Sequence, residues 1–155
     1  MHNRSHHHAF TLVELVLVML VIAVVAAMVV PSLNNTARGR RMGDTASQIV
    51  ALARLARTQA VTEGKTYRLN IDPNGGSYWL SVRDSDVFQI LGNWSYSVPD
   101  GLRVECNLQP QQDGLYVEFK QTGRSDPATI FVRDDNGSSL QVVSESATEL
   151  FHVAE

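Results

Sequence analysis

One carboxylate stands at the start of a long apolar run and is the best candidate for chemistry. Glu14 is followed by sixteen consecutive apolar residues, and no charged residue appears again before Arg38. A carboxylate inside an apolar helix is costly unless it is paired, and no Lys or Arg lies within two helical turns of it. If the chain were cut after Ala9, the new α-amine of Phe10 would lie one helical turn before Glu14. That amine could neutralise Glu14 of the same chain or of a neighbouring copy.

Groupings typical of catalysis or metal binding are weak elsewhere. No Gly-x-Ser-x-Gly elbow occurs, and a Ser-His-Asp triad would depend on His152, the only histidine outside the first nine residues. The histidines at 6–8 lie in a polar leader with nothing to hold them rigidly. Residues 84–86 and 134–137 offer carboxylates, but neither fits a twelve-residue calcium loop, and both are interpreted as turns. We therefore expect no enzyme activity, no cofactor and no metal site.

The charge of the chain is uneven and excludes further classes. From Met42 to the end there are 9 Lys and Arg against 15 Asp and Glu, a net charge of 9 − 15 = −6. A nucleic-acid-binding body should instead carry a basic stripe. A single cysteine, Cys106, excludes an internal disulfide and a CxxC site, and we interpret it as a half-buried strand residue. Trp79 and Trp94, each close to a tyrosine, are interpreted as strand packing, with a recognition surface as the alternative.

The apolar segment is long enough to cross a membrane. As a helix, Phe10–Leu33 would span about 36 Å, against about 30 Å for a hydrocarbon core. Three interpretations stay open: a secreted β protein whose Sec signal is cleaved near residues 25–27, a plain single-span anchor, or cleavage after Ala9. For the plain anchor, the arginines at 38, 40 and 41 would keep the body in the cytoplasm. The same arginines are expected to lie near lipid phosphates at the bilayer surface.

The start of the chain resembles a known export signal. Residues 9–14, Ala-Phe-Thr-Leu-Val-Glu, followed by the apolar run and Pro31, are similar to the class III signal of type IV pilins and type II secretion pseudopilins. The resemblance implies that a prepilin peptidase cleaves between Ala9 and Phe10 and that Phe10 is N-methylated. It also implies that Glu14 sets the register between subunits and that Pro31 kinks the helix. Other pilins or pseudopilins would be partners, and the body would lie in the periplasm.

The segment after Pro31 predicts a second, amphipathic stretch of helix. Pro31 could end the first helix instead of kinking it. Asp44 or Thr45 is a candidate amino-terminal cap, and Gly64 is a good terminator. Arg54 and Arg57 fall on the flank of the apolar stripe, and we expect both to be solvated. The residues at three- and four-residue steps that define the stripe are Ala46, Ile49, Val50, Ala53, Ala56 and Ala60.

Beyond Gly64 the apolar period changes to two, which predicts strands. The first two strands, joined by the turn at 72–76, form a β-hairpin. No second helix pattern exists, so parallel βαβ units are excluded. The predicted strands are 66–71, 77–82, 87–91, 102–108, 115–119, 129–133, 140–143 and 149–153. The fold class is therefore α+β, a long N-terminal helix packed on a C-terminal antiparallel sheet or sandwich.

This layout divides the chain into four parts: a leader at 1–9, a transmembrane or filament-core helix at 10–33, a stem helix at 34–64 and a β-rich periplasmic body at 65–155. The long helix, the early hairpin and the turn at 119–124 resemble the GspH/FimT branch of minor pseudopilins and minor pilins. The resemblance implies a minor pseudopilin of a type II secretion system, which contacts sibling subunits or secreted cargo.

The alternative within this branch is a FimT-like minor pilin of a type IV pilus. Some such pilins take up DNA through a Gly-Arg-x-Arg motif near the carboxyl end. Here Gly123-Arg124-Ser125-Asp126 keeps the first arginine and has an aspartate in place of the second. Arg124 is thus the one candidate contact, and since affinity for DNA comes chiefly from cations on phosphates, we do not expect DNA to be a partner.

Overall fold

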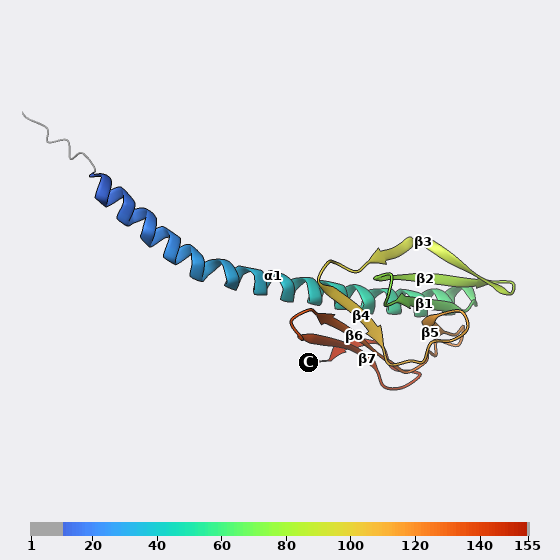
Figure 1. The fold of residues 1–155 in the computed structure, drawn as a ribbon. Helices are drawn as coiled ribbons and strands as arrows, with labels where there is room; N and C mark the ends of the chain where they lie inside the picture. The colour runs from blue at the N-terminus through green and yellow to red at the C-terminus, as the bar shows by residue number, and fades with distance from the viewer. Residues whose placement is uncertain (1–10, 155) are drawn as a thin grey trace, which may run out of the picture. The chain divides into compact units, whose positions relative to one another are not determined.

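Residues 11–154 form one helix followed by eight strands (Figure 1). The structure, a computed structural model, describes residues 11–154, with side chains at 11–26 and 39–154. It divides into two compact units, Met1–Arg38 and Gly39–Glu155. The elements are α1 (Leu12–Glu63), β1 (Tyr67–Asp72), β2 (Ser77–Asp84), β3 (Val87–Ser97), β4 (Leu102–Cys106), β5 (Leu115–Phe119), β6 (Ala128–Asp134), β7 (Ser139–Ser144) and β8 (His152–Ala154).

The strands form two four-stranded antiparallel sheets, which confirms the predicted α+β class. Sheet A has the order β3-β2-β1-β5, and sheet B has the order β4-β6-β7-β8. The predicted hairpin is confirmed, since β1 and β2 pair from Tyr67 with Val82 to Asp72 with Ser77. Inward side chains of β1 are buried and alternate with half-buried outward ones, as a sheet with one covered face requires.

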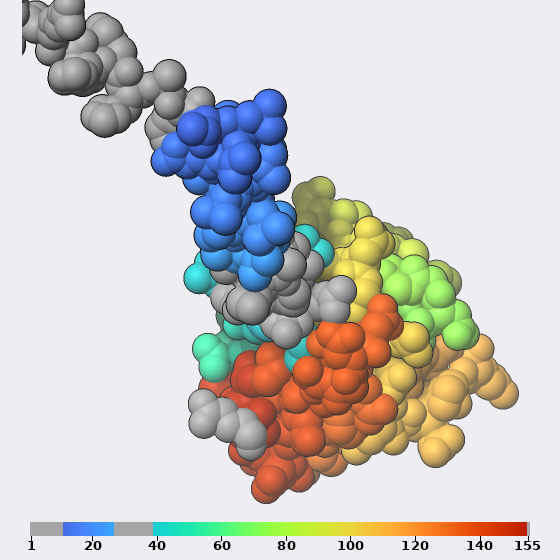
Figure 2. All heavy atoms as spheres, turned by 60° about the vertical axis from the view of Figure 1, so that its left-hand side comes forward, coloured from blue at the N-terminus to red at the C-terminus, as the bar shows by residue number. Residues whose placement is uncertain are grey.

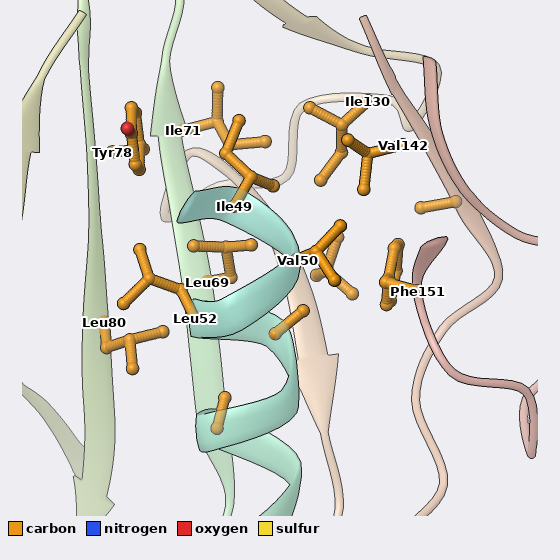
Figure 3. Packing of buried hydrophobic residues seen from close by; sticks show 14 of the residues in the cluster. Ile49, Val50, Leu52, Leu69, Ile71, Tyr78, Leu80, Ile130, Val142 and Phe151 are labelled. Atoms are coloured by element: carbon orange, nitrogen blue, oxygen red, sulfur yellow. The ribbon is translucent and has the colours of Figure 1, made fainter. Parts of the chain in front are cut away.

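The carboxyl-terminal part of α1 packs against both sheets (Figure 3). Leu52 lies beside Leu80 of sheet A, and Val50 lies on the side of Val142 and Phe151. Several of its buried positions are alanines, which let the helix backbone approach both sheets closely. The buried residues of α1 are Met42, Thr45, Ala46, Ile49, Val50, Leu52, Ala53, Ala56 and Ala60. The predicted apolar stripe is thus confirmed as core.

The predicted restart of the helix at Asp44 or Thr45 is wrong, because α1 continues through both residues. Thr45 is buried instead of capping a helix end. Gly43, just before Asp44, also lies within α1. A glycine inside a helix costs only about 1 kcal/mol, which is too little to interrupt α1. α1 also includes Pro31, so the helix does not end there. The predicted kink depends on a residue whose side chain lies outside the described part and stays a prediction. Gly64, with a φ of +63°, terminates α1 as expected.

The strand predicted at 87–91 differs most from its prediction, because it is six residues longer. β3 extends to Ser97 because it bulges: Trp79 and Ser81 of β2 are two residues apart, but their partners Ser95 and Ile90 are five apart. The three extra residues of β3, which include Gly92, form the bulge, and pairing with β2 resumes after it. Two strands are shorter than predicted: β4 ends at Cys106 instead of residue 108, and β8 begins at His152 instead of residue 149. Cys106 is confirmed as a half-buried residue of β4.

Candidate functional site

The start of α1 carries a helix cap that involves the carboxylate residue singled out above. The backbone N–H of Glu14 donates to Thr11 Oγ1 at 3.3 Å. A Thr three residues before a Glu is the sequence signature of a capping box, and sequence reasoning missed it. A carboxylate in the first helical turn is also favoured by the helix dipole. Because the bond uses the backbone N–H of Glu14, it leaves the carboxylate oxygens available to a cation.

The residues after Glu14 form an apolar helix surface (blue in Figure 2). Every large hydrophobic side chain between Leu12 and Val25 is exposed, from 44% at Val18 to 80% at Leu12. A helix that is apolar all round belongs in lipid or against other helices. Within the described residues, no helix is both long and apolar enough to cross a membrane. Ala9 and Phe10, the predicted cleavage site, lie outside the described residues.

Arg57 ties α1 to two loops of the body. Its guanidinium donates to three backbone carbonyls: Gly123 at 2.5 Å, Glu149 at 2.8 Å and Ala147 at 3.4 Å. The prediction that Arg57 is solvated is therefore wrong, whereas Arg54 is exposed as expected. The acceptors lie 66 to 92 residues further along the chain, so no local spacing could have indicated them. A planar guanidinium suits such multiple contacts because its donors form a fixed fork.

The turn that contains the candidate DNA-binding residue is packed against the helix. Gly123 has a φ of +77°, and a side-chain carbon added there would lie 3.2 Å from Val61 Cγ2. Arg124 is exposed. At the position of the missing second arginine, the carboxylate of Asp126 accepts the backbone N–H of Glu118 at 3.4 Å. Asp126 therefore adds negative charge next to Arg124, which does not favour binding of nucleic acid.

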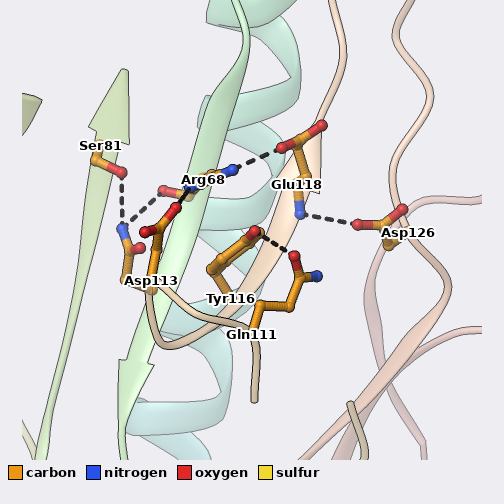
Figure 4. Close-up of polar contacts among 8 residues, drawn as sticks. Arg68, Ser81, Gln111, Asp113, Tyr116, Glu118 and Asp126 are labelled. Atoms are coloured by element: carbon orange, nitrogen blue, oxygen red, sulfur yellow. Dashed lines mark hydrogen bonds and ion pairs between the residues drawn. The ribbon is translucent and has the colours of Figure 1, made fainter. Parts of the chain in front are cut away.

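A second arginine is held on the outer face of sheet A (Figure 4). The guanidinium carbon of Arg68 lies 3.4 Å from the ring centroid of Phe88 and 3.8 Å from that of Tyr116. The guanidinium also pairs with Glu118 at 3.2 Å and with Asp113 at 3.4 Å. Cation–π contacts and partly buried ion pairs of this kind fix the side chain in place. The outer face of sheet A is thus built from ordered polar and aromatic groups.

Two tyrosine hydroxyls have strongly perturbed acidity. Burial, and then a hydrogen bond to Glu63 with its negative charge, raises the pKa of Tyr67 to about 12. Burial and the neighbouring Tyr96 raise the pKa of Tyr78 to about 12, and its hydroxyl contacts Gln48 Oε1 at 2.6 Å. Burial also raises the pKa of the Cys106 thiol, which makes it a poorer nucleophile. All three groups are neutral at physiological pH and serve packing.

The remaining groupings have local structural roles. His152 lies in β8 and is exposed, with Glu149 Oε1 3.8 Å from its ring. Asp134 accepts the backbone N–H groups of Asn136 and Ser138, as a tight turn requires. Among residues 11–154, no three His, Cys, Asp or Glu side chains converge as a metal site would need.

Comparison with known proteins gives two family matches. Residues 4–30 match the prokaryotic N-terminal methylation motif. Residues 45–148, two thirds of the chain, match the family of the type II transport protein GspH. No curated protein matches the sequence.

Two solved structures share the fold. One is the structure of the minor pseudopilin EpsH from the type 2 secretion system of Vibrio cholerae, with a TM-score of 0.63 and 14% identity. The match covers 74% of this chain and 96% of that chain. The other is a crystal structure of the same Vibrio cholerae pseudopilin, with a TM-score of 0.63, 12% identity, and coverage of 74% and 93%.

A methylation motif on an apolar helix, joined to a helix packed against two antiparallel sheets, defines a pilin-like subunit. The chain belongs to the GspH family of type II transport proteins, the pseudopilins of the type II secretion system. The predicted membership of the pseudopilin superfamily, GspH branch, is therefore confirmed.

Proposed function

We propose that the chain is a minor pseudopilin built into a periplasmic pseudopilus through its N-terminal helix, after a prepilin peptidase cleaves between Ala9 and Phe10. It works by assembly, not catalysis. The observation that carries the proposal is the helix surface from Leu12 to Val25, apolar and exposed throughout, with one carboxylate at its start. Such a surface needs lipid before assembly and other helices after it. Both environments are expected in turn as the subunit leaves the inner membrane for the fibre.

The parts of the chain would then act in sequence. Residues 1–9 are the leader, and residues 10–33 hold the precursor in the inner membrane with the body on the periplasmic side. Residues 34–64 are the stem, and Pro31 provides a kink before it. Residues 65–155 form the body, which contacts sibling subunits or secreted cargo. Cleavage exposes the α-amine of Phe10, which is then methylated.

Glu14 is proposed to neutralise that amine, in its own chain or in an adjacent subunit. An uncompensated carboxylate in an apolar environment costs several kcal/mol, so pairing determines which register of neighbouring helices is stable. The Thr11 cap supports this, because it fixes the first turn without using the carboxylate oxygens. The pair can form only after proteolysis, which links processing to assembly.

The test is Glu14→Gln in the full-length chain in its host. We expect the variant to be inserted and cleaved as in the parent, but to be missing from the assembled fibre. Thr11→Val is the matched control, because it removes the cap and keeps the charge, and it should assemble. If Glu14→Gln assembles as well as the parent, charge pairing is wrong. If Thr11→Val fails equally, the role of this turn is structural.

Mass spectrometry of the native amino terminus tests the processing step. A chain that starts at methylated Phe10 supports the proposal. A start at Met28 would indicate Sec cleavage, and an intact Met1 would indicate a plain membrane anchor. The two latter results would each refute assembly by the pseudopilin route.

A further inference from the structure

The outer face of sheet A carries a groove that the proposed assembly does not use. It consists of two adjoining hollows of about 320 and 410 Å³, which share Asn70, Trp79 and Asp113 in their linings. Asn70 and Trp79 are cross-strand partners and form its floor. The Asn70 amide donates to Ser81 Oγ at 2.9 Å and to the Trp79 carbonyl at 3.3 Å, so the floor is fixed. The groove is therefore a preformed feature of the sheet.

One wall of the groove is the edge strand β3, which is unusually apolar on its surface. Val87 and Ile90, both in the lining, are 66% and 65% exposed, and Trp94 in the bulge is 40% exposed. These are three of the six exposed large hydrophobic side chains in the described part of Gly39–Glu155. Proteins usually protect edge strands with charges or cover. An apolar edge beside a preformed groove is typical of a surface that binds another chain.

The charges of the groove indicate what kind of chain fits. Its ionisable lining residues are Asp72, Asp86, Asp113 and Arg68, a net charge of −2. Arg68 is occupied, since it is stacked between two rings, ion-paired, and only 11% exposed. Asp113 is 73% exposed, and its contact with Arg68 uses Oδ2 only. Within the described residues, Asp113 Oδ1 has no partner and is available to a cation from outside.

We propose that this groove binds an extended segment of a different protein that carries a lysine or arginine side chain. The apolar stem of that side chain would lie on Trp79, and its cation would pair with Asp113 (Figure 4 shows Asp113 beside Arg68). A second copy of this chain is disfavoured, because two such faces would bring like charges together. The inference does not depend on cleavage or on Glu14, since it uses only residues of Gly39–Glu155.

The experiment uses the parent full chain in detergent micelles for titration, and a Trp94→Phe version, in which Trp79 is the only tryptophan, for emission. The probe is the blocked peptide acetyl-Thr-Val-Thr-Lys-Thr-Val-Thr-amide. The matched peptide has norleucine in place of Lys, which keeps the stem and removes the charge. Binding is followed by Trp79 emission and by isothermal titration. We expect the Lys peptide to change the emission and to bind about 5-fold more tightly than the norleucine peptide, which is the upper end of what an exposed ion pair contributes.

Variants locate the interaction. Asp113→Asn should lower the affinity for the Lys peptide about 5-fold and leave the affinity for the norleucine peptide unchanged. Asp100→Asn is the matched control, an exposed aspartate outside the groove lining, and should change neither. Ile90→Thr should lower the affinity for both peptides.

Three outcomes would overturn the inference: no binding of the Lys peptide, equal binding of both peptides, or no effect of Asp113→Asn. Self-association of the parent chain that is abolished by Ile90→Thr would identify a second copy as the occupant instead. Glu14→Gln should bind the peptide like the parent, so failure here is distinguishable from failure of the assembly proposal.

Discussion

Replacing Arg57 by Ala should destabilise the body more than any other single change of a charged residue on α1. The guanidinium makes two strong hydrogen bonds, to Gly123 and Glu149 carbonyls at 2.5 and 2.8 Å, and a weak one to Ala147 at 3.4 Å. A hydrogen bond to a charged group contributes about 1.5–3 kcal/mol. Since Arg57 is only half-buried, water recovers part of this, and the lower value applies. The two strong bonds then give a loss of about 3 kcal/mol in the free energy of unfolding.

The loss would be measured by thermal unfolding of the full chain in detergent, followed by near-ultraviolet circular dichroism. About 3 kcal/mol corresponds to a fall in Tm of about 10 °C for a body of this size. Hydrogen exchange should also quicken in residues 145–150, because the carbonyls of Ala147 and Glu149 in this loop lose their donor. Arg54→Ala is the matched control, since this arginine on the same helix is exposed, and it should change stability by less than about 0.5 kcal/mol. Equal stabilities of the two variants would refute the reasoning.

Three further predictions concern the body. Gly123→Ala should lower the free energy of unfolding by about 2 kcal/mol, because φ is +77° and the new carbon contacts Val61. Gly137→Ala, with φ +89° but open space around it, should lower it by about 1 kcal/mol, and urea unfolding compares the two variants. The pKa of Tyr78 is raised to about 12, so its neutral hydroxyl contributes its full stabilisation below about pH 10 and loses it between pH 10 and 12. The free energy of unfolding should therefore fall between pH 10 and 12, and it should fall less in Tyr78→Phe. Leu80→Ala, at a fully buried site, should cost about 2–5 kcal/mol in the same assay.

Much of the fold could be predicted because its signals are local. The β1–β2 hairpin follows from alternation on both sides of Asp72-Pro-Asn-Gly-Gly, and each half places its apolar residues on the inner face. The apolar stripe of α1 follows from three- and four-residue steps. The helix restart was wrong because a buried Thr45 resembles a cap in sequence. Propensity at one residue is a small term, and tertiary packing of the surrounding helix outweighs it.

The contacts that could not be predicted are long-range. Arg57 reaches carbonyls in two distant loops, and backbone acceptors carry no residue signature. The stacking of Arg68 requires that Phe88 and Tyr116 flank it, which depends on the strand order β3-β2-β1-β5. The groove around Trp79 likewise depends on this order and on the bulge of β3. Side chains of this kind can be assigned a function only after the sheet has been assembled.

The packing of α1 also determines how the body can respond to assembly. Residues Met42–Ala60 contribute core to both sheets, and Arg57 bonds to loops at Gly123 and Glu149. Withdrawing this part of the helix would expose the inner faces of two sheets and break those bonds, at a cost comparable with the whole stability of a domain. An assembly contact that fixes the helix between Gly39 and Glu63 must therefore fix sheets A and B as well. The groove on sheet A would be presented at a set position, as a partner-binding face of a fibre subunit requires.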